Sequence, residues 1–347
     1  MPALFESLKK QTWQDFEIIV VDNASSDDPA NVILSEAKDL LDHESRIDSS
    51  ATPQNDKKIR VRFIQNPTNV GFAAGHNQIF ALSQSSYHLV LNQDIYLEPD
   101  CLEKLIGFMD GHADAAMVGP KLLKWNFGDL NKGNEVDSLG LLVLRSRRVI
   151  DKKKISERGS HSTIAQGKLS TTTRNDNVSE VFGVSGACAL FRRAAVETVG
   201  GLFDENFFTY KEDVDLAYRI NSAGGKYYVF PEAVAHHART GADSGQANDY
   251  AQARNKTNQP DLVKYYSYRN HLITLFKNEY WQNFIIDLPW ILWYELKKFG
   301  YFLLFDRAVL AGLGDIWQAR QEIKKQRTGI KKLRKLNWKE MRSRMSF

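Results

Sequence analysis

The sequence is poor in cysteine and lacks the motifs of several nucleotide-binding classes. Its 347 residues include two cysteines, Cys101 and Cys188, so no disulfide framework is expected and a reducing, cytoplasmic compartment is the simpler interpretation. No basic stretch followed by an apolar one opens the chain, so we expect no secretory signal there. The absence of a GxGxxG fingerprint and of a Gly-rich phosphate loop argues against a dinucleotide oxidoreductase and a nucleotidyltransferase.

The overall composition is that of an ordinary globular protein, but the charge is unevenly distributed. Apolar residues make up 43% and charged residues 25% of the chain, and the net charge is +4. Residues 320–347 contain eleven Lys or Arg and two Glu. This basic tail is either a solvated, frayed terminus or a contact for anionic lipid or nucleic acid. No nucleic-acid-binding motif accompanies it, so we expect no nucleic-acid partner.

Strand-like and helix-like stretches alternate along the first part of the chain. Apolar or alternating runs predict strands at residues 16–22, 59–66, 88–94 and 115–120. Helical periodicity predicts helices over residues 4–13, 27–41, 71–84 and 98–110. The alternation favours an α/β fold with a mixed, mainly parallel sheet flanked by helices. We expect a first domain over residues 1–260 and a C-terminal helical extension over residues 261–347.

Two polar segments interrupt this pattern. Residues 43–58 are rich in turn-forming residues and predict a long loop or insertion. Residues 145–178 are basic, rich in Ser and Thr and poor in apolar side chains, which predicts a mobile excursion.

The segment 283–305 is strongly apolar and aromatic. Four charged residues and a proline interrupt it, which argues against a membrane span: Asp287, Pro289, Glu295, Lys297 and Lys298. Its tryptophans and tyrosines suit the lipid headgroup level, and the basic tail follows it. The segment is therefore either an interfacial helix on a membrane surface or a helix buried against the first domain.

Polar residues and glycines cluster where predicted strands end. Asp22 and Asn23 follow the strand at 16–22, and ligands of open α/β sheets bind at the carboxyl ends of strands. The stretch "NPTNVGFAAGHN" contributes Asn69, Gly71 and Asn77, whose small or amide side chains allow a ligand to approach the backbone closely. These residues are candidates for a nucleotide-binding site.

A second strand end carries Asn92 and Asp94. Because they are two residues apart in an extended segment, they point the same way. Oxygen ligands in this arrangement can hold a divalent cation against a diphosphate. A strand-end Asp is also common as a helix cap or turn residue, which is the alternative here.

An acidic pair opens the helix predicted to begin near residue 211. Asp213 falls on the apolar stripe of that helix, where a carboxylate needs a reason, so we predict it as a general base. Glu212 falls instead beside Asp215 and Arg219, with which it can form a surface ion-pair network; it is the second candidate for the base. Acids in the first turn also suit the helix dipole, which is the structural alternative.

Two histidines, His236 and His237, follow a short predicted strand. A histidine pair can serve packing, metal binding or phosphate contact, and the sequence by itself does not choose among them.

The order of these clusters resembles the inverting family 2 glycosyltransferases with the GT-A fold, especially the bacterial rhamnosyltransferase-like branch. The likeness covers roughly residues 4–275. The stretches that carry it are "SLKKQTWQDFEIIVVDNASSDD", "NPTNVGFAAGHN", "LVLNQDIYLEPD", "GVSGACALFRRAAVETVGGLFDENFFTYKEDVDLAYR" and "PEAVAHH".

The resemblance implies a role for each candidate residue. The residues expected to hold the nucleotide-sugar are Asp22, Asn23, Asn69, Gly71, Asn77 and Asn92. Asp94 would be the metal-binding acid of a DxD-type motif, in which Asn92 stands where many members have Asp. The pair Glu212–Asp213 would be the base motif, and His237 a metal or diphosphate contact.

The resemblance also implies an activity. The chain is expected to move a sugar, possibly rhamnose, from a nucleotide-diphosphate sugar to a glycan or lipid-linked acceptor, with inversion, in cell-surface polysaccharide synthesis. Mg²⁺ or Mn²⁺ would assist the leaving diphosphate, and the protein would be peripheral at the inner face of the cell membrane. The alternative is a non-catalytic, membrane-associated scaffold.

The first helix-like stretch, "MPALFESLKKQ", precedes any predicted strand. Members of the family normally have an apolar strand before this helix. We therefore expect a gap in the sheet beside residues 16–22 and unpaired backbone groups there. The expected consequence is low stability or low activity of the chain as printed.

Overall fold

The computed structural model describes residues 2–26, 59–126, 133–154, 178–238 and 259–345. The helix expected over 27–41 and the loop expected over 43–58 lie outside the described residues, as does most of the segment 145–178.

A small sheet forms the N-terminal part of the fold. Strand β1 (Glu17–Asp22) pairs in parallel with β2 (Arg60–Gln65), which confirms both predicted strands. Among the described strands β1 has no partner on its other edge, so this sheet is not hydrogen-bonded to the larger one. Helix α1 (Pro2–Lys9) precedes β1 and packs on the larger sheet beside β4, through Leu4 and Leu8.

The larger sheet has seven strands and holds most of the core. Its central path runs β3 (Tyr87–Leu91), β10 (Cys188–Arg192), β5 (Ala115–Lys124), β11 (Lys226–His237) and β4 (Ile95–Leu97). Two short strands extend it, since β6 (Val136–Ser138) pairs with β5 and β9 (Ser179–Val181) with β11.

The predicted mixed sheet is confirmed, but its expected mainly parallel character needs correction. Within the described strands the parallel pairs are β1–β2 and β5–β11, whereas β10, β4, β6 and β9 all run antiparallel to their neighbours. The physical reason is burial. A strand covered on both faces reads as a continuous apolar run whichever way it runs, so the sequence does not reveal its direction.

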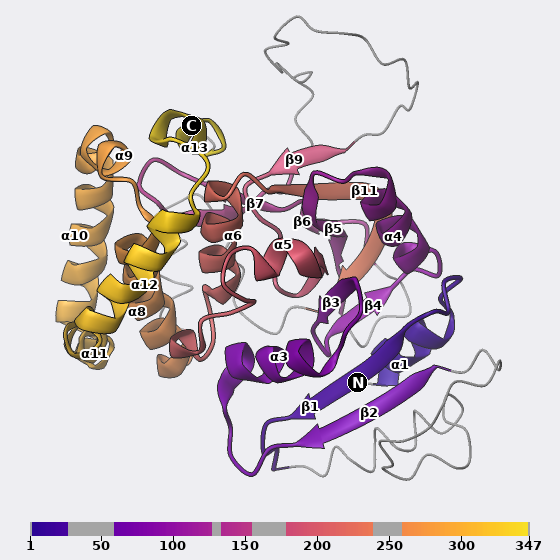
Figure 1. The fold of residues 1–347 in the computed structure, drawn as a ribbon. Coiled ribbons are helices and arrows are strands. Elements are labelled where there is room, and N and C mark those ends of the chain that lie inside the picture. Colours follow the sequence, from indigo (N-terminus) through magenta and orange to yellow (C-terminus); the bar gives the residue numbers. More distant parts are fainter. Residues whose placement is uncertain (1, 27–58, 127–132, 155–177, 239–258, 346–347) are drawn as a thin grey trace, which may run out of the picture.

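Helices cover both faces of the larger sheet (Figure 1). Alternate residues of β10 face opposite sides: Ala189 and Phe191 join the core under helix α6 (Glu212–Ser222), and Cys188 and Leu190 join the core under helix α4 (Cys101–Gly111). Both cysteines of the chain are buried free thiols in the α4 core. Further helices of this region, before the C-terminal helices, are α3 (Gly71–Leu82) and α5 (Arg193–Glu197).

A hairpin made of β7 (Leu141–Val143) and β8 (Val149–Asp151) contradicts part of the predicted mobile excursion. Between the strands, the side chain of Arg147 is completely buried and forms ion pairs with Glu279 and Asp287. The expectation is wrong for residues 145–154, because the partners of this cation lie more than 130 positions further along the chain. Local composition contains no trace of them.

The C-terminal helices form a layer beside α6 (Figure 1). They are α8 (Asp261–Asn278), α9 (Trp281–Ile286), α10 (Leu288–Phe305), the short η2 (Arg307–Leu310), α11 (Ala311–Gln318), α12 (Arg320–Leu333) and α13 (Trp338–Ser343). The basic tail is therefore not a frayed terminus. Met341 and Met345 lie in the core under α6, and the guanidinium groups of Arg334 and Arg342 contact α8 and Asp287.

The apolar segment 283–305 contains the end of α9 and the whole of α10, which packs on its neighbours and leaves one face exposed. Helix α10 buries Ile291, Lys298 and Phe302, whereas Trp293 and Leu296 are 66% and 63% exposed. Among the described helices, none combines the length and apolar character that crossing a membrane requires.

Candidate active site

The turn between β3 and β4 meets the ends of β10 and β11. The backbone N–H of Asn92 donates to the carbonyl of Ala187 at 2.9 Å, and the carbonyl of Asp94 accepts from the N–H of Ala238 at 2.9 Å. The sequence predicts that Asn92 and Asp94 point the same way. In the structure the backbone of Asn92 is bonded to the residue before β10, and that of Asp94 to the residue after β11. Both contacts lie at the same end of the sheet.

Asp94 and His237 lie together, as the proposed metal ligands should. His237 Nε2 is 3.4 Å from Asp94 Oδ2, and His237 Nδ1 is 2.8 Å from Asp137 Oδ2. Burial lowers the pKa of His237, but the hydrogen bonds to Asp137 and Asp94 outweigh it and raise that pKa to about 9. Asp137 comes from the three-residue strand β6, and nothing in the local sequence marks it as part of the site.

Asp94 and His237 fit a divalent cation whose coordination shell is completed by ligands from the substrate. Within the described part of the chain, no group of three or more His, Cys, Asp or Glu side chains could form a metal cage. Asp94 Oδ1, however, is buried without a hydrogen-bond partner among the described residues. One carboxylate and one imidazole, whose Nε2 proton the cation would displace, suit Mn²⁺ or Mg²⁺ when diphosphate oxygens and water supply the remaining ligands.

The acidic pair Glu212–Asp213, predicted to supply the general base, stands at the start of α6, close to the β3–β4 turn. Asp213 accepts hydrogen bonds from the N–H groups of Gly186 at 3.2 Å and Val214 at 2.7 Å. Gly186 is the neighbour of Ala187, whose carbonyl holds the Asn92 backbone. The segment 186–187 therefore links the acidic pair to the candidate metal ligands.

The two carboxyl groups of the pair differ in their surroundings. Glu212 is 7% exposed, and its Oε2 has no hydrogen-bond partner among the described residues. Burial and the neighbouring Asp213 raise the pKa of Glu212 to about 8. Burial also raises the pKa of Asp213. The charge of Lys211 and the N–H groups of Gly186 and Val214 oppose this shift, because they favour the charged form of Asp213. Burial and the neighbouring charge therefore favour the protonated form of Glu212, and Asp213, whose charged form the N–H groups of Gly186 and Val214 stabilise, is the better candidate for the base.

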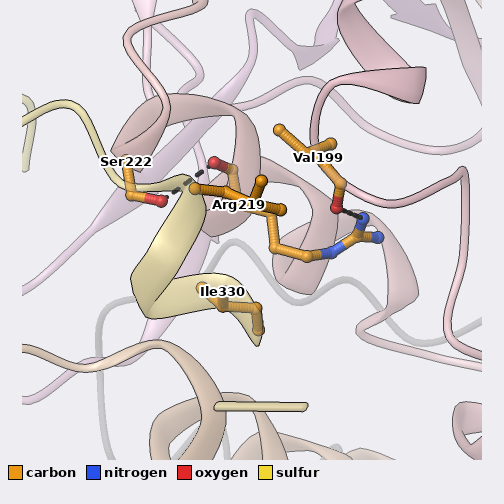
Figure 2. Close-up of a pocket in the computed structure, with 5 residues that line it drawn as sticks. Val199, Arg219, Ser222 and Ile330 are labelled. Carbon is orange, nitrogen blue, oxygen red and sulfur yellow. Dashed lines mark hydrogen bonds between the residues drawn. The ribbon is translucent and has the colours of Figure 1, made fainter. Parts of the chain in front are cut away.

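The expected surface network around Glu212 is wrong. Ten of the eleven residues of α6 are buried, and Asp213 is the partly exposed exception. Arg219 is ion-paired with Asp215 at 3.0 Å. It also donates to the carbonyl of Val199 at 3.1 Å, a bond that Figure 2 shows. Helix α8 covers the face that the sequence pattern assigns to solvent, and its Lys277 lies 3.0 Å from Asp215.

The candidate nucleotide side joins β1, β2 and the start of α3. Asn23 donates to the carbonyl of Gly71 at 3.1 Å and accepts from Asn66 at 2.8 Å. The N–H of Gly71 donates to Asn69 Oδ1 at 2.9 Å, and Gly71 has a φ of +84° that favours glycine. Asn66, at the end of β2, was not selected from the sequence.

Asp22 carries an acceptor atom to which no described residue donates. The residue is 4% exposed; its Oδ1 accepts from the N–H of Ser25 at 3.0 Å, and its Oδ2 has no partner among the described residues. Asn77 is different, because its amide exchanges hydrogen bonds with the backbone of Phe203 at 2.9 and 3.0 Å. Its predicted nucleotide contact stays a prediction, as do those of the other selected residues.

Comparison with known proteins assigns the family. The sequence profile of glycosyl transferase family 2 matches residues 1–200, more than half of the chain, so the chain belongs to this family and is a glycosyltransferase. The mixed sheet with flanking helices is the GT-A fold. A solved structure titled "Crystal structure of GalNAc-T7 with UDP, GalNAc and Mn2+" aligns with 81% of this chain and 46% of that one, at 12% identity and a TM-score of 0.57. That likeness concerns the fold.

Two curated relatives match parts of the chain. N-acetylglucosaminyl-diphospho-decaprenol L-rhamnosyltransferase of Mycobacterium tuberculosis is 51% identical over 55 residues, 16% of this chain and 18% of the relative. The uncharacterized protein y4gI of Sinorhizobium fredii is 25% identical over 237 residues, 68% of this chain and 22% of the relative. The matched stretches thus span about a fifth of the length of these relatives.

Proposed function

We propose that this glycosyltransferase moves a sugar from a nucleoside diphosphate sugar to a hydroxyl group of a glycan or lipid-linked acceptor, with inversion. The observation that carries the proposal is the placement of Asp213 beside the Asp94–His237 pair through the segment 186–187. A base for the acceptor and ligands for a diphosphate-bound cation then stand at one edge of the sheet. Rhamnose is the proposed sugar, on the strength of the short rhamnosyltransferase match.

In the proposed step, Asp213 accepts the proton of the acceptor hydroxyl while the oxygen of that hydroxyl forms a bond to the anomeric carbon. The bond from that carbon to the diphosphate breaks, and its electron pair leaves with the nucleoside diphosphate. A single displacement of this kind inverts the anomeric configuration. A bound Mg²⁺ or Mn²⁺, held by Asp94 and His237, would offset the negative charge of the diphosphate.

The nucleoside would lie across β1, β2 and the start of α3. Asp22 Oδ2 offers an acceptor to a ribose hydroxyl or a base N–H. The glycine at position 71 lets the backbone come close to a ligand. Asn23, Asn66 and Asn69 hold this backbone in place.

A thermal-shift and transfer experiment tests the proposal. UDP- and dTDP-sugars should raise the melting temperature, more so with Mn²⁺, because only ligands of the native state stabilise it. Asp213→Asn should keep the shift and lose transfer. The proposal fails if no nucleotide-sugar binds with or without Mn²⁺, or if Asp213→Asn turns over normally.

We further propose that α10 seats the protein on the inner face of the cell membrane, close to a lipid-linked acceptor. Opposite its buried stripe the helix exposes a face that is apolar but for one lysine, formed by Trp290, Leu292, Trp293, Leu296, Phe299, Leu303 and Leu304. Contiguous apolar faces of this kind mark interaction sites. Lys297 lies 5.5 Å from the Trp293 ring and Arg320 lies 4.6 Å from the Trp317 ring. Tryptophan beside a cation matches an anionic headgroup layer.

A vesicle co-sedimentation assay tests the membrane proposal. The chain should sediment with vesicles containing phosphatidylserine and less with phosphatidylcholine alone. Leu296→Glu should release it, whereas Leu82→Glu, at a leucine on α3 that is 50% exposed against 63% for Leu296, should not. Equal binding of both variants contradicts the assignment of the α10 face. A stable dimer that Leu296→Glu dissolves would assign this face to a second copy instead.

A non-catalytic scaffold remains the second candidate. It is favoured by the separate pairing of the small and the large sheet among the described strands, since the candidate nucleotide side lies on the small sheet and the acidic pair packs on the large one. Donor hydrolysis or transfer by the purified chain excludes it.

A further inference from the structure

The backbone leading into α6 is unusual. Phe208, Tyr210 and Lys211 have φ values of +59°, +66° and +73°, a conformation that L side chains rarely adopt. Three such residues within four positions persist only when the surroundings hold them. They immediately precede Glu212 and Asp213, the acidic pair of the candidate site.

One buried side chain from the C-terminal helices holds this segment. The amide nitrogen of Asn270, in α8, lies 2.8 Å from each of three carbonyl oxygens, those of Phe207, Thr209 and Tyr210. Asn270 is 0% exposed. An amide nitrogen carries two hydrogens, so at least one of them is shared. Its oxygen accepts from Arg269 at 2.9 Å, so the amide orientation is fixed.

The same segment also touches the candidate nucleotide side. The carbonyl of Phe208 accepts from the N–H of Ala73, in the first turn of α3, at 3.1 Å. A Cβ atom added at Gly71 would meet the Phe208 ring at 2.5 Å. A shift of the 207–211 backbone would therefore move the acidic pair relative to the start of α3.

We propose that Asn270 is a positioning residue, which sets the acidic pair of α6 against the nucleotide side by fixing residues 207–211. The proposal rests on the proposed function for the role of Asp213. A misplacement of about 1 Å can cost on the order of 100-fold in rate, so Asn270→Ala should lower kcat about 10- to 100-fold and leave donor affinity within a few-fold. Asn270→Asp should be worse, because its carboxylate would face three carbonyl oxygens.

Asn283 offers a matched control. It is equally buried, at 0% exposed, but its amide donates to the carbonyl of Trp338 at 2.9 Å, which joins α9 to α13. Asn283→Ala therefore removes a buried amide hydrogen bond from the same helical layer without touching residues 207–211.

The experiment compares the full chain with Asn270→Ala, Asn270→Asp and Asn283→Ala. Hydrogen exchange should accelerate at least tenfold at the amides of Phe208 and Thr209 in the Asn270 variants and stay unchanged in Asn283→Ala. The pH dependence of kcat should shift only in the Asn270 variants, since the surroundings of the acidic pair change there.

Two results would overturn the proposal: unchanged exchange at residues 207–211 in Asn270→Ala, or equal losses of kcat and melting temperature in Asn270→Ala and Asn283→Ala. If Asn270→Asp does not fold, the Asn270→Ala comparison still decides. If the unmodified chain shows no transfer with any donor, the proposed function fails, while the exchange measurement still tests whether Asn270 fixes the segment.

Discussion

The two sheets that meet at the candidate site are built differently. In β1 five of six residues are only half-buried, and Asp22 is the buried one. In β5 eight of ten residues are buried, and in β10 four of five. This difference in burial matches the two roles that we propose for the site, nucleotide binding and base catalysis. The proposed nucleotide side lies on the less buried sheet, and the acidic pair lies on a helix packed into the main core.

This contrast suggests how the site divides binding from chemistry. A region with fewer buried apolar contacts opens at lower free energy than the core. A binding side can tolerate or use such opening, whereas a base must keep its position relative to the reacting atoms.

The largest expected effect separates the two sides by kinetics. Asp213→Asn should lower kcat by about 10²- to 10⁴-fold, the usual contribution of a general base, with nucleotide binding retained. Asp22→Asn should instead weaken donor binding and leave kcat largely intact. Steady-state kinetics with the donor found in the thermal-shift panel measure both. A kcat loss in Asp22→Asn as large as that in Asp213→Asn would break the comparison.

The next effect compares two arginines by stability. Arg147→Ala should cost about 3–5 kcal/mol, because it leaves the buried carboxylate of Glu279 without its cation. Arg62→Ala removes an ion pair to Glu17 between β2 and β1 whose side chains are 38% and 23% exposed, and should cost about 0–1 kcal/mol. Urea unfolding followed by fluorescence gives both values. Similar costs would show that the two regions are equally packed.

The free energy of unfolding is expected to depend on pH through two buried histidines, one in α3 and one in β3. Burial, followed by the charge of His88, lowers the pKa of His76 in α3 to about 3, and burial, followed by Arg193, lowers that of His88 in β3 to about 4. Stability from these neutral histidines is complete above pH 6.5 and is lost as pH falls towards the folded pKa values. Each should remove about 1.4 kcal/mol per pH unit in that window.

Urea unfolding at pH 7.0, 6.0 and 5.0 measures this dependence, with His76→Leu and His88→Leu as comparisons. Each variant should flatten the loss of stability on acidification. A slope that is the same in all three proteins would assign the acid sensitivity to other groups.

The smallest expected effect is local. Backbone amides of β1 should exchange faster than those of β10 under native conditions, because β1 has one described ladder partner and β10 has two. Native-state hydrogen exchange read by mass spectrometry tests this. Equal protection in the two strands would remove the distinction between the sheets.

Sequence patterns predicted the elements well where one face or both faces are buried. The strands at β1, β2 and β3 and the helices α3, α4 and α6 fall where periodicity and strand-length apolar runs indicate. The same patterns did not reveal the direction of strands buried on both faces. They also assigned a solvent face to α6, because a helix surrounded by core on all sides and rich in polar residues looks amphipathic from its sequence.

The candidate site divides in the same way. Asp94 and Glu212 could be selected from their places at a strand end and in the first turn of a helix, Asp213 from its place on the apolar stripe, and His237 from the family resemblance. Asp137 and Asn270 could not, since they act through partners 60 to 100 residues away. A lone Asp in a short strand or a lone Asn in a helix carries no local signal of such a contact.

The sequence alone thus determined the family-like order of motifs, the strand and helix positions and the acidic pair, because these depend on local periodicity and on the side chains themselves. The tertiary structure alone gave the two carboxyl groups of the pair different surroundings. Asp213 receives the N–H groups of Gly186 and Val214, whereas Glu212 is buried, and both features are properties of the folded chain.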